Sequence, residues 1–390
     1  MIIQPKTRGF ICTTAHPAGC EKNVAEAAAR AKKLGGEGPK RVLVIGSSTG
    51  YGLACRVAAA FGYGAATIGV ALERPAAGSR TATAGWYNTQ AFEKLAAAEN
   101  LTFASLNGDA YSRELKDEAI AAVREKMGQL DLVIYSLAAP KRVDSAGGVT
   151  YSSVIKPIGE IYNSKTVDFH TGEVSDVSVS PATEEETDGT IKVMGGEDWY
   201  EWMQALSDAG VLANGVQTLA FSYIGPSMTH PVYKDGTIGR AKEDLEQKAA
   251  LLRDMLAPIG GRALVSVNKA LVTQASSAIP VVPLYISLLY RVMKDKGLHE
   301  DCTDQMIRMF ERLYAPENIG AALPLDSAGR VRMDDYEMQP EIQADVLARW
   351  EQVSSENLEQ LADLQGYRDD FFSLFGFGLS GIDYEAEVEA

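Results

Sequence analysis

The sequence predicts an α/β protein built on a doubly wound parallel sheet of the Rossmann type. Three observations lead to this prediction. A β-branched apolar run at residues 41–45 leads directly into the glycine-rich segment 46–52, Gly-Ser-Ser-Thr-Gly-Tyr-Gly. An alanine-rich stretch that favours a helix, residues 53–60, follows the glycines. Apolar runs then alternate with segments of helical periodicity, which is the pattern of successive βαβ units.

Closely spaced glycines between a strand and a helix are typical of dinucleotide binding. They let the backbone turn sharply and approach a pyrophosphate, and the helix that follows presents unpaired N–H groups to it. The spacing G-x-x-x-G-x-G differs from the common G-x-G-x-x-G and resembles that of short-chain dehydrogenases and reductases. Because such loops also occur as plain tight turns, the prediction of a nucleotide site depends on the flanking strand and helix.

The remaining elements follow in order along the chain. After the first strand, we expect strands at 64–72, 101–106, 130–138, 216–223 and 262–267. Helices are expected at 89–100, 112–128, 197–209 and 239–256, and then at 284–296, 301–313 and 341–364.

Between residues 140 and 195 the alternation stops. The segment is rich in Ser, Thr, Asp, Glu and Gly, with short β-like pieces such as 191–193. An insertion of this length is more often a lid or a hairpin than a bare loop. We therefore predict one large Rossmann-type domain over 1–390, with an inserted lid or hairpin region at 140–195 and substrate-side and C-terminal helices at 276–390. The acidic end, 383–390, is expected to be a solvated tail.

Composition excludes several classes of protein. The chain of 390 residues is 46% hydrophobic and carries a net charge of −15, which argues against nucleic acid as the main partner. We expect a cytoplasmic location because no signal peptide is visible. The most apolar window, 276–290, contains two prolines and is too short to span a bilayer, so we interpret it as core or as the wall of an apolar pocket.

The four cysteines are few and scattered, as in proteins of the reduced cytoplasm. Cys12, His16 and Cys20 are spaced evenly, but they offer only three candidate ligands where a structural zinc site needs four. We therefore expect no metal.

Further cofactor contacts are expected where the strands end. Glu73 ends the second strand, where a carboxylate accepts hydrogen bonds from a ribose diol and repels a 2′-phosphate, and this favours NADH. Arg74 beside it would instead suit the phosphate of NADPH. Asp109–Ala110 ends the third strand and Leu137–Ala138 the fourth. After the last strand, a backbone amide of Leu271–Thr273 and the Thr273 hydroxyl are placed to hold the nicotinamide amide and pyrophosphate.

Hydride transfer to a carbonyl-conjugated substrate needs a proton donor, and a tyrosine with a nearby lysine suits this task. The usual spacing, Y-x3-K, occurs at Tyr290 and Lys294, too late in the chain, and we interpret that pair as a helix surface pair. Tyr233 and Lys242 have the spacing Y-x8-K and follow the fifth strand. On one helix they would lie on opposite faces, so Tyr233 is expected on a loop and Lys242 on the helix. Tyr223 suits a substrate contact or the core equally.

Together these residues resemble the FabV class of trans-2-enoyl thioester reductases, which includes the bacterial trans-2-enoyl-CoA reductases. The resemblance runs along essentially the whole chain. It is carried by residues 15–20, 65–70, 85–88, 193–199, 223–226, 267–273 and 381–388.

The resemblance implies a monomeric Rossmann-fold enzyme that uses NADH to reduce the 2,3 double bond of an enoyl-CoA or enoyl-acyl carrier protein. By position, Tyr233 matches the family's proton-donating tyrosine, Lys242 its cofactor-binding lysine and Tyr223 its substrate-binding tyrosine. The apolar segment 279–289 is expected to line the acyl chain. The implied NADH-binding residues are Gly46, Ser47, Ser48, Thr49, Gly50, Tyr51, Leu72, Glu73, Asp109, Ala110, Leu137, Ala138, Lys242, Leu271, Val272 and Thr273.

Two alternatives stay open. A ketoreductase on the same fold would act on 3-ketoacyl thioesters, although a well-placed Y-x3-K is missing. A non-catalytic NAD(H)-binding protein would keep the fold without turnover. The sequence does not distinguish coenzyme A from acyl carrier protein, and it does not determine the preferred chain length.

Overall fold

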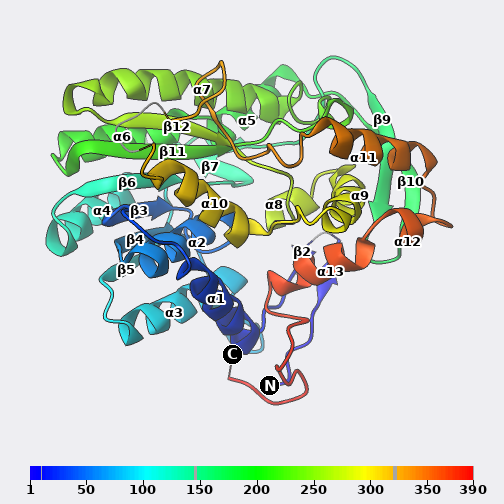
Figure 1. The fold of residues 1–390 in the computed structure, drawn as a ribbon, viewed down its shortest axis with the longest axis horizontal. Coiled ribbons are helices and arrows are strands. Elements are labelled where there is room, and N and C mark those ends of the chain that lie inside the picture. The colour runs from blue at the N-terminus through cyan, green and yellow to red at the C-terminus, as the bar shows by residue number, and fades with distance from the viewer. Residues whose placement is uncertain (10, 145–146, 319–322, 390) are drawn as a thin grey trace.

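The computed structural model describes residues 1–9, 11–144, 147–318 and 323–389. Its centre is a seven-stranded sheet in the order β13-β12-β11-β6-β3-β4-β5, and all described pairings within it are parallel. The prediction of a doubly wound parallel sheet is confirmed (Figure 1). The strands are β3 (Arg41–Ile45), β4 (Ala66–Ala71), β5 (Phe103–Asn107), β6 (Leu130–Tyr135), β11 (Leu212–Ser222), β12 (Arg262–Val267) and β13 (Val331–Arg332).

Helices cover both faces of this sheet, which explains why its strands read as continuous apolar runs. Side chains alternate along β3, so that Leu43 and Ile45 pack against one helix layer and Val42 and Val44 against the other. The first layer contains α4 (Arg113–Lys126), α6 (Glu197–Asp208) and α7 (Thr237–Leu256). The second contains α2 (Gly50–Val57), its continuation η1 (Ala58–Gly62) and α10 (Cys302–Tyr314), with α1 (Pro17–Ala31) and α3 (Ala84–Ala98) packed behind.

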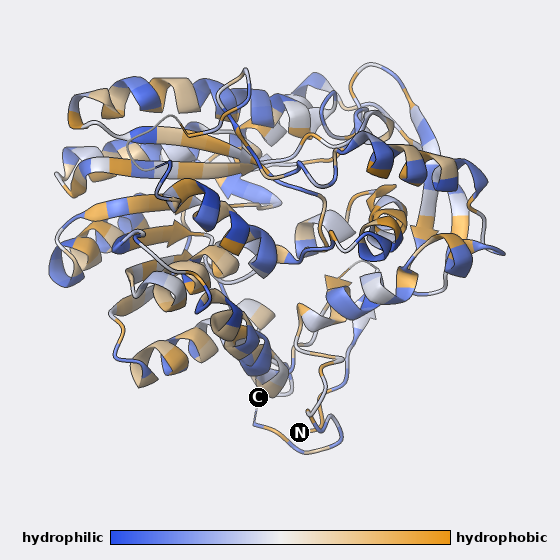
Figure 2. Ribbon diagram, in the orientation of Figure 1, coloured by the Kyte–Doolittle hydropathy of each residue, from blue (hydrophilic) through white to orange (hydrophobic). Residues whose placement is uncertain are grey.

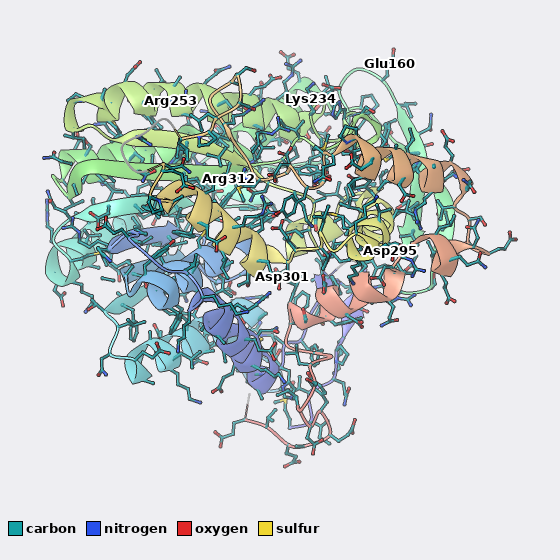
Figure 3. All side chains as sticks on the ribbon, in the orientation of Figure 1. Glu160, Lys234, Arg253, Asp295, Asp301 and Arg312 are labelled. Atoms are coloured by element: carbon teal, nitrogen blue, oxygen red, sulfur yellow. The ribbon has the colours of Figure 1, made fainter. Side chains whose placement is uncertain are left out.

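Hydropathy follows this layering. Figure 2 shows apolar residues along the sheet and mixed residues on α7, whose outer face meets solvent. Charged side chains such as Glu160, Lys234 and Asp295 are exposed, and Glu160 extends from the upper edge of the molecule in Figure 3. In the part of the chain that the structure describes, no helix has the length and apolar character needed to cross a membrane.

The inserted region contains two antiparallel hairpins and a helix. The hairpins are β7 (Lys141–Val143) with β8 (Thr150–Ser152), and β9 (Tyr162–Asp168) with β10 (Glu173–Val179). The β-like interpretation of residues 191–193 is wrong, because they lie in α5 (Glu184–Met194). A capping box between Thr183 and Glu186 and three acidic residues in the first turn begin this helix. They outweigh the local β preference of Ile and Val.

A second apolar core lies beside the sheet and is built mainly by the C-terminal half of the chain, with further residues from 3–20, 82–87 and 167–169. Its helices are α8 (Gln274–Ser277), α9 (Val282–Asp295), α11 (Pro340–Gln352), α12 (Leu358–Leu361) and α13 (Leu364–Ser373). The single helix expected at 341–364 is wrong, because Val353 has extended backbone and the Ser354 N–H donates to the Asn357 side chain at 2.8 Å. Such a side-chain bond offers the backbone an alternative to the helix.

Hydrogen bonds hold both ends of the described chain in place. The acidic end is mostly exposed, but it is anchored: the Met1 amino group donates to the Val388 carbonyl at 2.7 Å, and the two termini lie close together in Figure 1. The first residues form a small hairpin, β1 (Thr7–Arg8) with β2 (Ile11–Cys12), before α1. His16 caps α1, because its Nδ1 accepts the Gly19 N–H at 3.3 Å. This capping accounts for the histidine between the two cysteines.

Candidate active site

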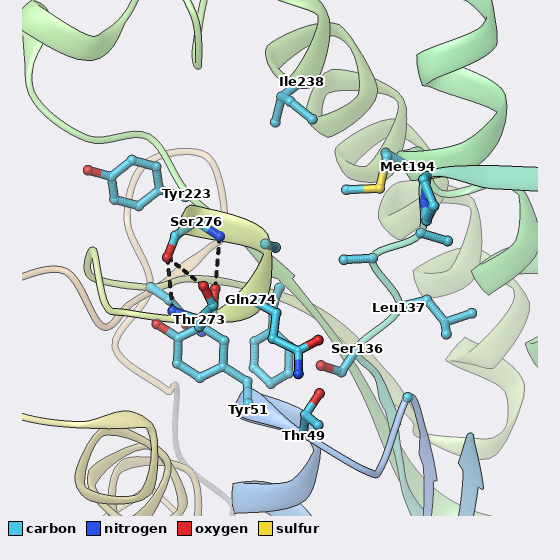
Figure 4. A pocket seen from close by; sticks show the side chains of 18 of the residues that line it. Thr49, Tyr51, Ser136, Leu137, Met194, Tyr223, Ile238, Thr273, Gln274 and Ser276 are labelled. Atoms are coloured by element: carbon cyan, nitrogen blue, oxygen red, sulfur yellow. Dashed lines mark hydrogen bonds between the residues drawn. The ribbon is translucent and has the colours of Figure 1, made fainter. Parts of the chain in front are cut away.

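A cavity of about 700 Å³ opens where the parallel strands end. This volume suits a cofactor or substrate site, and the position lies where the strand order reverses between β3 and its neighbours β4 and β6. Figure 4 shows part of its wall. The residues that follow the strands and line the cavity are Gly46, Leu72, Glu73, Gly108–Ala110, Ser136–Ala139, Tyr223 and Asn268–Leu271.

All site residues predicted from the sequence line this cavity except Ser47 and Val272. Ser47 is buried and its hydroxyl donates to the Val70 carbonyl at 3.3 Å, so it ties the glycine loop to β4. Val272 is buried as well, and its N–H donates to the Tyr290 hydroxyl at 3.4 Å. Tyr290 is therefore a core residue, and the interpretation of Tyr290 and Lys294 as a surface pair is wrong for the tyrosine.

The glycine loop has the geometry of an anion cradle. Gly46 has φ +86°, and a Cβ there would overlap the carbonyl of Ser136. A Cβ on Gly52 would overlap the carbonyl of Gly46, so both positions require glycine. Helix α2 begins at Gly50 without a side-chain cap from Thr49, and the cavity reaches these residues. The first N–H groups of the helix are thus available to a phosphate.

Glu73 is held in place from several sides. Its N–H donates to the Asn107 side chain at 2.7 Å, and that side chain returns a bond to the Glu73 carbonyl at 3.0 Å. Ser48 donates its hydroxyl to the Glu73 carboxylate at 2.6 Å, and a Cβ on Gly85 would overlap that carboxylate. Arg74, which would favour a 2′-phosphate, is exposed and does not line the cavity.

Tyr233 and Lys242 reach the cavity from a turn and a helix, as their spacing required. Tyr233 lies in the turn before α7, and Lys242 lies in the second turn of α7. The Lys242 ammonium donates to the Phe221 carbonyl at 2.9 Å, and burial lowers the pKa of this lysine to about 8. Among the described residues, none forms a hydrogen bond with the Tyr233 hydroxyl. Burial, and then the nearby Glu337, raise the pKa of Tyr233, so the phenol stays neutral.

Tyr223 both faces the cavity and packs against its neighbours. Its ring lies 4.7 Å from the Tyr233 ring at 68°, an edge-to-face pair. It also lies against Gly225, whose φ of +70° and missing Cβ leave room for it. Its hydroxyl donates to the Glu337 carboxylate at 2.9 Å. This packing agrees with the core interpretation, and the place of Tyr223 in the cavity wall leaves its substrate contact as a prediction.

Family models decide between the classes of protein that this geometry allows. A model described as the trans-2-enoyl-CoA reductase catalytic region matches residues 80–314. A model for the NAD(P)H binding domain of trans-2-enoyl-CoA reductase matches residues 2–78, and one for an enoyl reductase FAD binding domain matches residues 325–388. This chain belongs to the trans-2-enoyl-CoA reductase family.

Individual family members match over the full chain. An enoyl-[acyl-carrier-protein] reductase [NADH] of Coxiella burnetii is 57% identical, with 100% of this chain and 96% of that protein covered. A trans-2-enoyl-CoA reductase [NADH] of Clostridium perfringens is 54% identical, with 100% and 99% covered. The solved structure of a Treponema denticola trans-2-enoyl-CoA reductase in complex with NAD superposes with a TM-score of 0.94 at 47% identity, covering 100% of this chain and 98% of that one. The resemblance drawn from the sequence is confirmed.

Residues 325–388, which match the model named for FAD, are all described by the structure and do not form a dinucleotide site. The described residues of 325–388 form the two-residue strand β13 and the helices α11, α12 and α13, without a βαβ unit or a phosphate-binding glycine loop. Of that segment, Leu374 alone lines the large cavity among the described residues. The residues present do not fit a flavin dinucleotide.

What this segment does supply to the reductase is Glu337, which the sequence analysis missed. Glu337 is fully buried, and besides Tyr223 it accepts the Tyr285 hydroxyl at 2.6 Å and the Ala270 N–H at 2.6 Å. Its sequence neighbourhood, Asp-Asp-Tyr-Glu, has the composition of a solvated turn. The only signal would have been its position shortly after a strand, and the two-residue β13 is too short to recognise.

Two further predictions concern the apolar and capping residues of the cavity. Ile279, Val282 and Ile286 line it, whereas most of α9 is buried in the second core, so the window 276–290 serves as both wall and core. Thr273 caps α8: its hydroxyl oxygen accepts the Ser276 N–H at 3.1 Å and its own N–H donates to the Ser276 hydroxyl at 2.9 Å (Figure 4). The Thr273 amide is thus engaged, and of these groups its hydroxyl hydrogen is left for a ligand.

Proposed function

We propose that this chain reduces the 2,3 double bond of trans-2-enoyl thioesters with NADH. The observation that carries the proposal is that the glycine loop, Glu73, Tyr233 and Lys242 line one cavity. The names of the relatives supply the reaction: the Coxiella burnetii protein is named an enoyl-[acyl-carrier-protein] reductase [NADH], and the Clostridium perfringens protein a trans-2-enoyl-CoA reductase [NADH].

The cavity residues suit NADH. The free N–H groups at the start of α2 and the turn at Gly46 would hold the pyrophosphate. Glu73 would accept hydrogen bonds from the adenosine ribose, and Asp109–Ala110 would flank the adenine. Leu137–Ala138 and Leu271–Thr273 would line the nicotinamide end. When bound, NADH supplies the hydride that reaches the β-carbon of the enoyl thioester.

Tyr233 would stabilise the charge that then builds on the thioester oxygen. Its hydroxyl has no described protein partner and stays protonated, so it can donate to an enolate oxygen in a site with little water. Lys242 is protonated at neutral pH, because its pKa is about 8, and would hold the cofactor ribose. Tyr223 would bind the substrate beside Tyr233. The α-carbon receives a proton to complete the reduction.

Other parts of the site would exclude water and hold the acyl chain. Ile279, Val282 and Ile286 offer an apolar wall for the acyl chain. The inserted region contributes Lys141 and Met194 to the opposite side, and we infer that it acts as a partial lid. The relatives' names include both coenzyme A and acyl carrier protein, so either carrier fits the proposal. The resemblance implies a monomer, which light scattering would test, and the few scattered cysteines favour a cytoplasmic location.

The test is loss of NADH absorbance when crotonyl-CoA is added to the purified protein, with NADPH and acetoacetyl-CoA in parallel. We expect oxidation of NADH with crotonyl-CoA. Oxidation with acetoacetyl-CoA alone would instead support a ketoreductase. Uptake of NADH without oxidation by any acyl thioester, including longer and carrier-bound ones, would support a non-catalytic binding protein.

A further inference from the structure

The most unusual buried group beside the cavity is the carboxyl of Glu337. One oxygen, Oε1, lies 2.9 Å from the Tyr223 hydroxyl and 2.6 Å from the Tyr285 hydroxyl. The other, Oε2, accepts the Ala270 N–H at 2.6 Å. The turn that carries Glu337 is fixed because Gln343 donates its side-chain amide to the Glu337 carbonyl at 2.7 Å. The mechanism above does not use this carboxyl.

A tyrosine hydroxyl has one hydrogen to donate. While Glu337 is ionised, the carboxylate only accepts, and it takes the hydrogens of both tyrosines. Tyr223 then has lone pairs alone for a ligand. Because a thioester oxygen is itself an acceptor, Tyr223 cannot bind it in this state. Figure 4 agrees with this assignment, since the Tyr223 hydroxyl is turned away from Leu137 and Met194 across the pocket.

The bonds around Glu337 determine where a proton on it would go. Oε2 is occupied by the Ala270 N–H, which places the proton on Oε1. The Tyr285 oxygen already accepts from the Gln343 amide at 3.1 Å and donates to Glu337 at 2.6 Å, whereas the Tyr223 oxygen accepts from no described group. The neutral carboxyl therefore donates to the Tyr223 oxygen across the same 2.9 Å. That exchange releases the Tyr223 hydrogen for a ligand in the cavity.

Charged and titratable groups surround this carboxyl on several elements. Lys269, after β12, is buried and its ammonium faces the carbonyls of Ala270 and Glu300 at 3.5 Å and 3.3 Å. Four neutral phenols lie near it, those of Tyr223, Tyr285, Tyr233 and Tyr51. On the side of α10, Glu300 raises the pKa of Lys269 and Arg308 lowers it. Burial raises the pKa of Glu337, and the hydrogen bonds and Lys269 oppose this only in part. Both protonation states are therefore within reach.

We propose that Glu337 is a positioning residue whose protonation sets the direction of the Tyr223 hydrogen bond, so that the neutral form presents Tyr223 to the thioester oxygen. The inference rests on the reductase function proposed above. It assigns to the C-terminal segment a role in substrate binding. Glu337 itself does not touch the substrate.

The test measures the KM for crotonyl-CoA at saturating NADH between about pH 5 and pH 9, a range that spans a raised carboxyl pKa. For the wild type we expect KM to rise about tenfold per pH unit above the pKa of Glu337. In Glu337→Gln the amide nitrogen donates to Tyr223 as the neutral acid does, so KM should stay low and flat. In Tyr223→Phe it should be high and flat.

Tyr285→Phe is the matched control. It removes one hydrogen bond to the charged carboxyl but leaves Tyr223 in place, so the rise in KM should move to higher pH. This variant also keeps the proposal testable if Glu337→Gln fails to fold. If titration of Lys242 contributes to the pH dependence of KM, that contribution should persist in Glu337→Gln. The contribution of Glu337 should be missing from this variant.

A flat KM in an active wild type, or the same rise in Glu337→Gln, overturns the positioning role and leaves the reductase function intact. Absence of turnover at every pH overturns the reductase function instead. In that case infrared difference spectra of the enzyme still test the carboxyl. A protonated-carboxyl band that titrates in the wild type and is missing in Glu337→Gln supports the inference, and the lack of such a band overturns it.

Discussion

Lys242 should make the binding of NADH depend on pH. Its ammonium lies half-buried with a described bond to the Phe221 carbonyl, and burial lowers its pKa from 10.5 to about 8. An anionic cofactor beside it favours the charged form, so above pH 8 a proton must bind together with NADH. We expect a constant Kd below about pH 7, and a Kd about tenfold higher at pH 9, because about one molecule in ten then keeps the proton.

Lys242 should also make the free energy of unfolding depend on pH. The sign is opposite to that for a lysine in a surface ion pair, because folding lowers the pKa of Lys242. The pKa of Lys242 is lower in the folded than in the unfolded chain, so the unfolded chain binds more protons between pH 8 and pH 10.5. Stability of the cofactor-free protein should therefore rise over that range. The lowered pKa corresponds, at about 1.4 kcal/mol for each pKa unit, to about 3 kcal/mol of lost stability at pH 7. Lys242→Met should recover part of it.

The assay is a fluorescence titration of NADH from about pH 7 to pH 9, with urea unfolding of the cofactor-free protein at pH 7. Lys234→Met is the matched control, since that lysine is exposed at the surface near the same turn (Figure 3). It should leave the Kd profile unchanged. A flat Kd in the wild type, or an equal rise in Lys242→Met, would refute the reasoning.

Three further substitutions test the site. Tyr233→Phe should lower kcat by about 10²–10³ with an NADH Kd within about twofold; loss of NADH binding would contradict its role. Gly46→Ala places a Cβ at φ +86° against the Ser136 carbonyl and should lower the free energy of unfolding in urea by over about 3 kcal/mol. Gly64→Ala, where φ is +64° and space is open, should lower it by about 1 kcal/mol. Equal losses would contradict the close contact at Gly46. Glu73→Ala should reduce the ratio of kcat/KM for NADH to that for NADPH by about tenfold or more, which corresponds to about 1.4 kcal/mol. An unchanged ratio would contradict the role of Glu73 in selecting NADH.

The sheet could be predicted because each strand is recognisable from the residues within it and directly after it. A strand buried on both faces must be apolar throughout, as residues 41–45 are, and the glycines at 46–52 mark the turn to the next helix. The break near Val353 and the helix over 191–193 depend on side-chain caps that outweigh the preference of neighbouring residues. Local patterns do not reveal them.

Part of the site could be predicted for the same reason. Tyr233, Lys242 and the cofactor residues follow strands that the pattern locates, so their convergence could be inferred. Glu337 could not be found in this way, because its burial results from packing against Tyr223 and Tyr285, which lie far from it in the sequence. An acidic residue in an acidic segment looks solvated until the tertiary contacts are known.

The late position of β13 and Glu337 in the chain has a consequence for synthesis. The catalytic-region model ends at residue 314, before β13 pairs with Ser266 and Val267 of β12 and before Glu337 reaches Tyr223 and Tyr285 beside the cavity. A nascent chain stopped there would contain nearly the whole sheet with an unpaired apolar edge, and such edges pair readily with other chains. Contacts of this sequence separation also form slowly. Ribosome-bound chains shorter than about residue 340 should therefore be the aggregation-prone species, and a chaperone that shields them would act before the polypeptide is released.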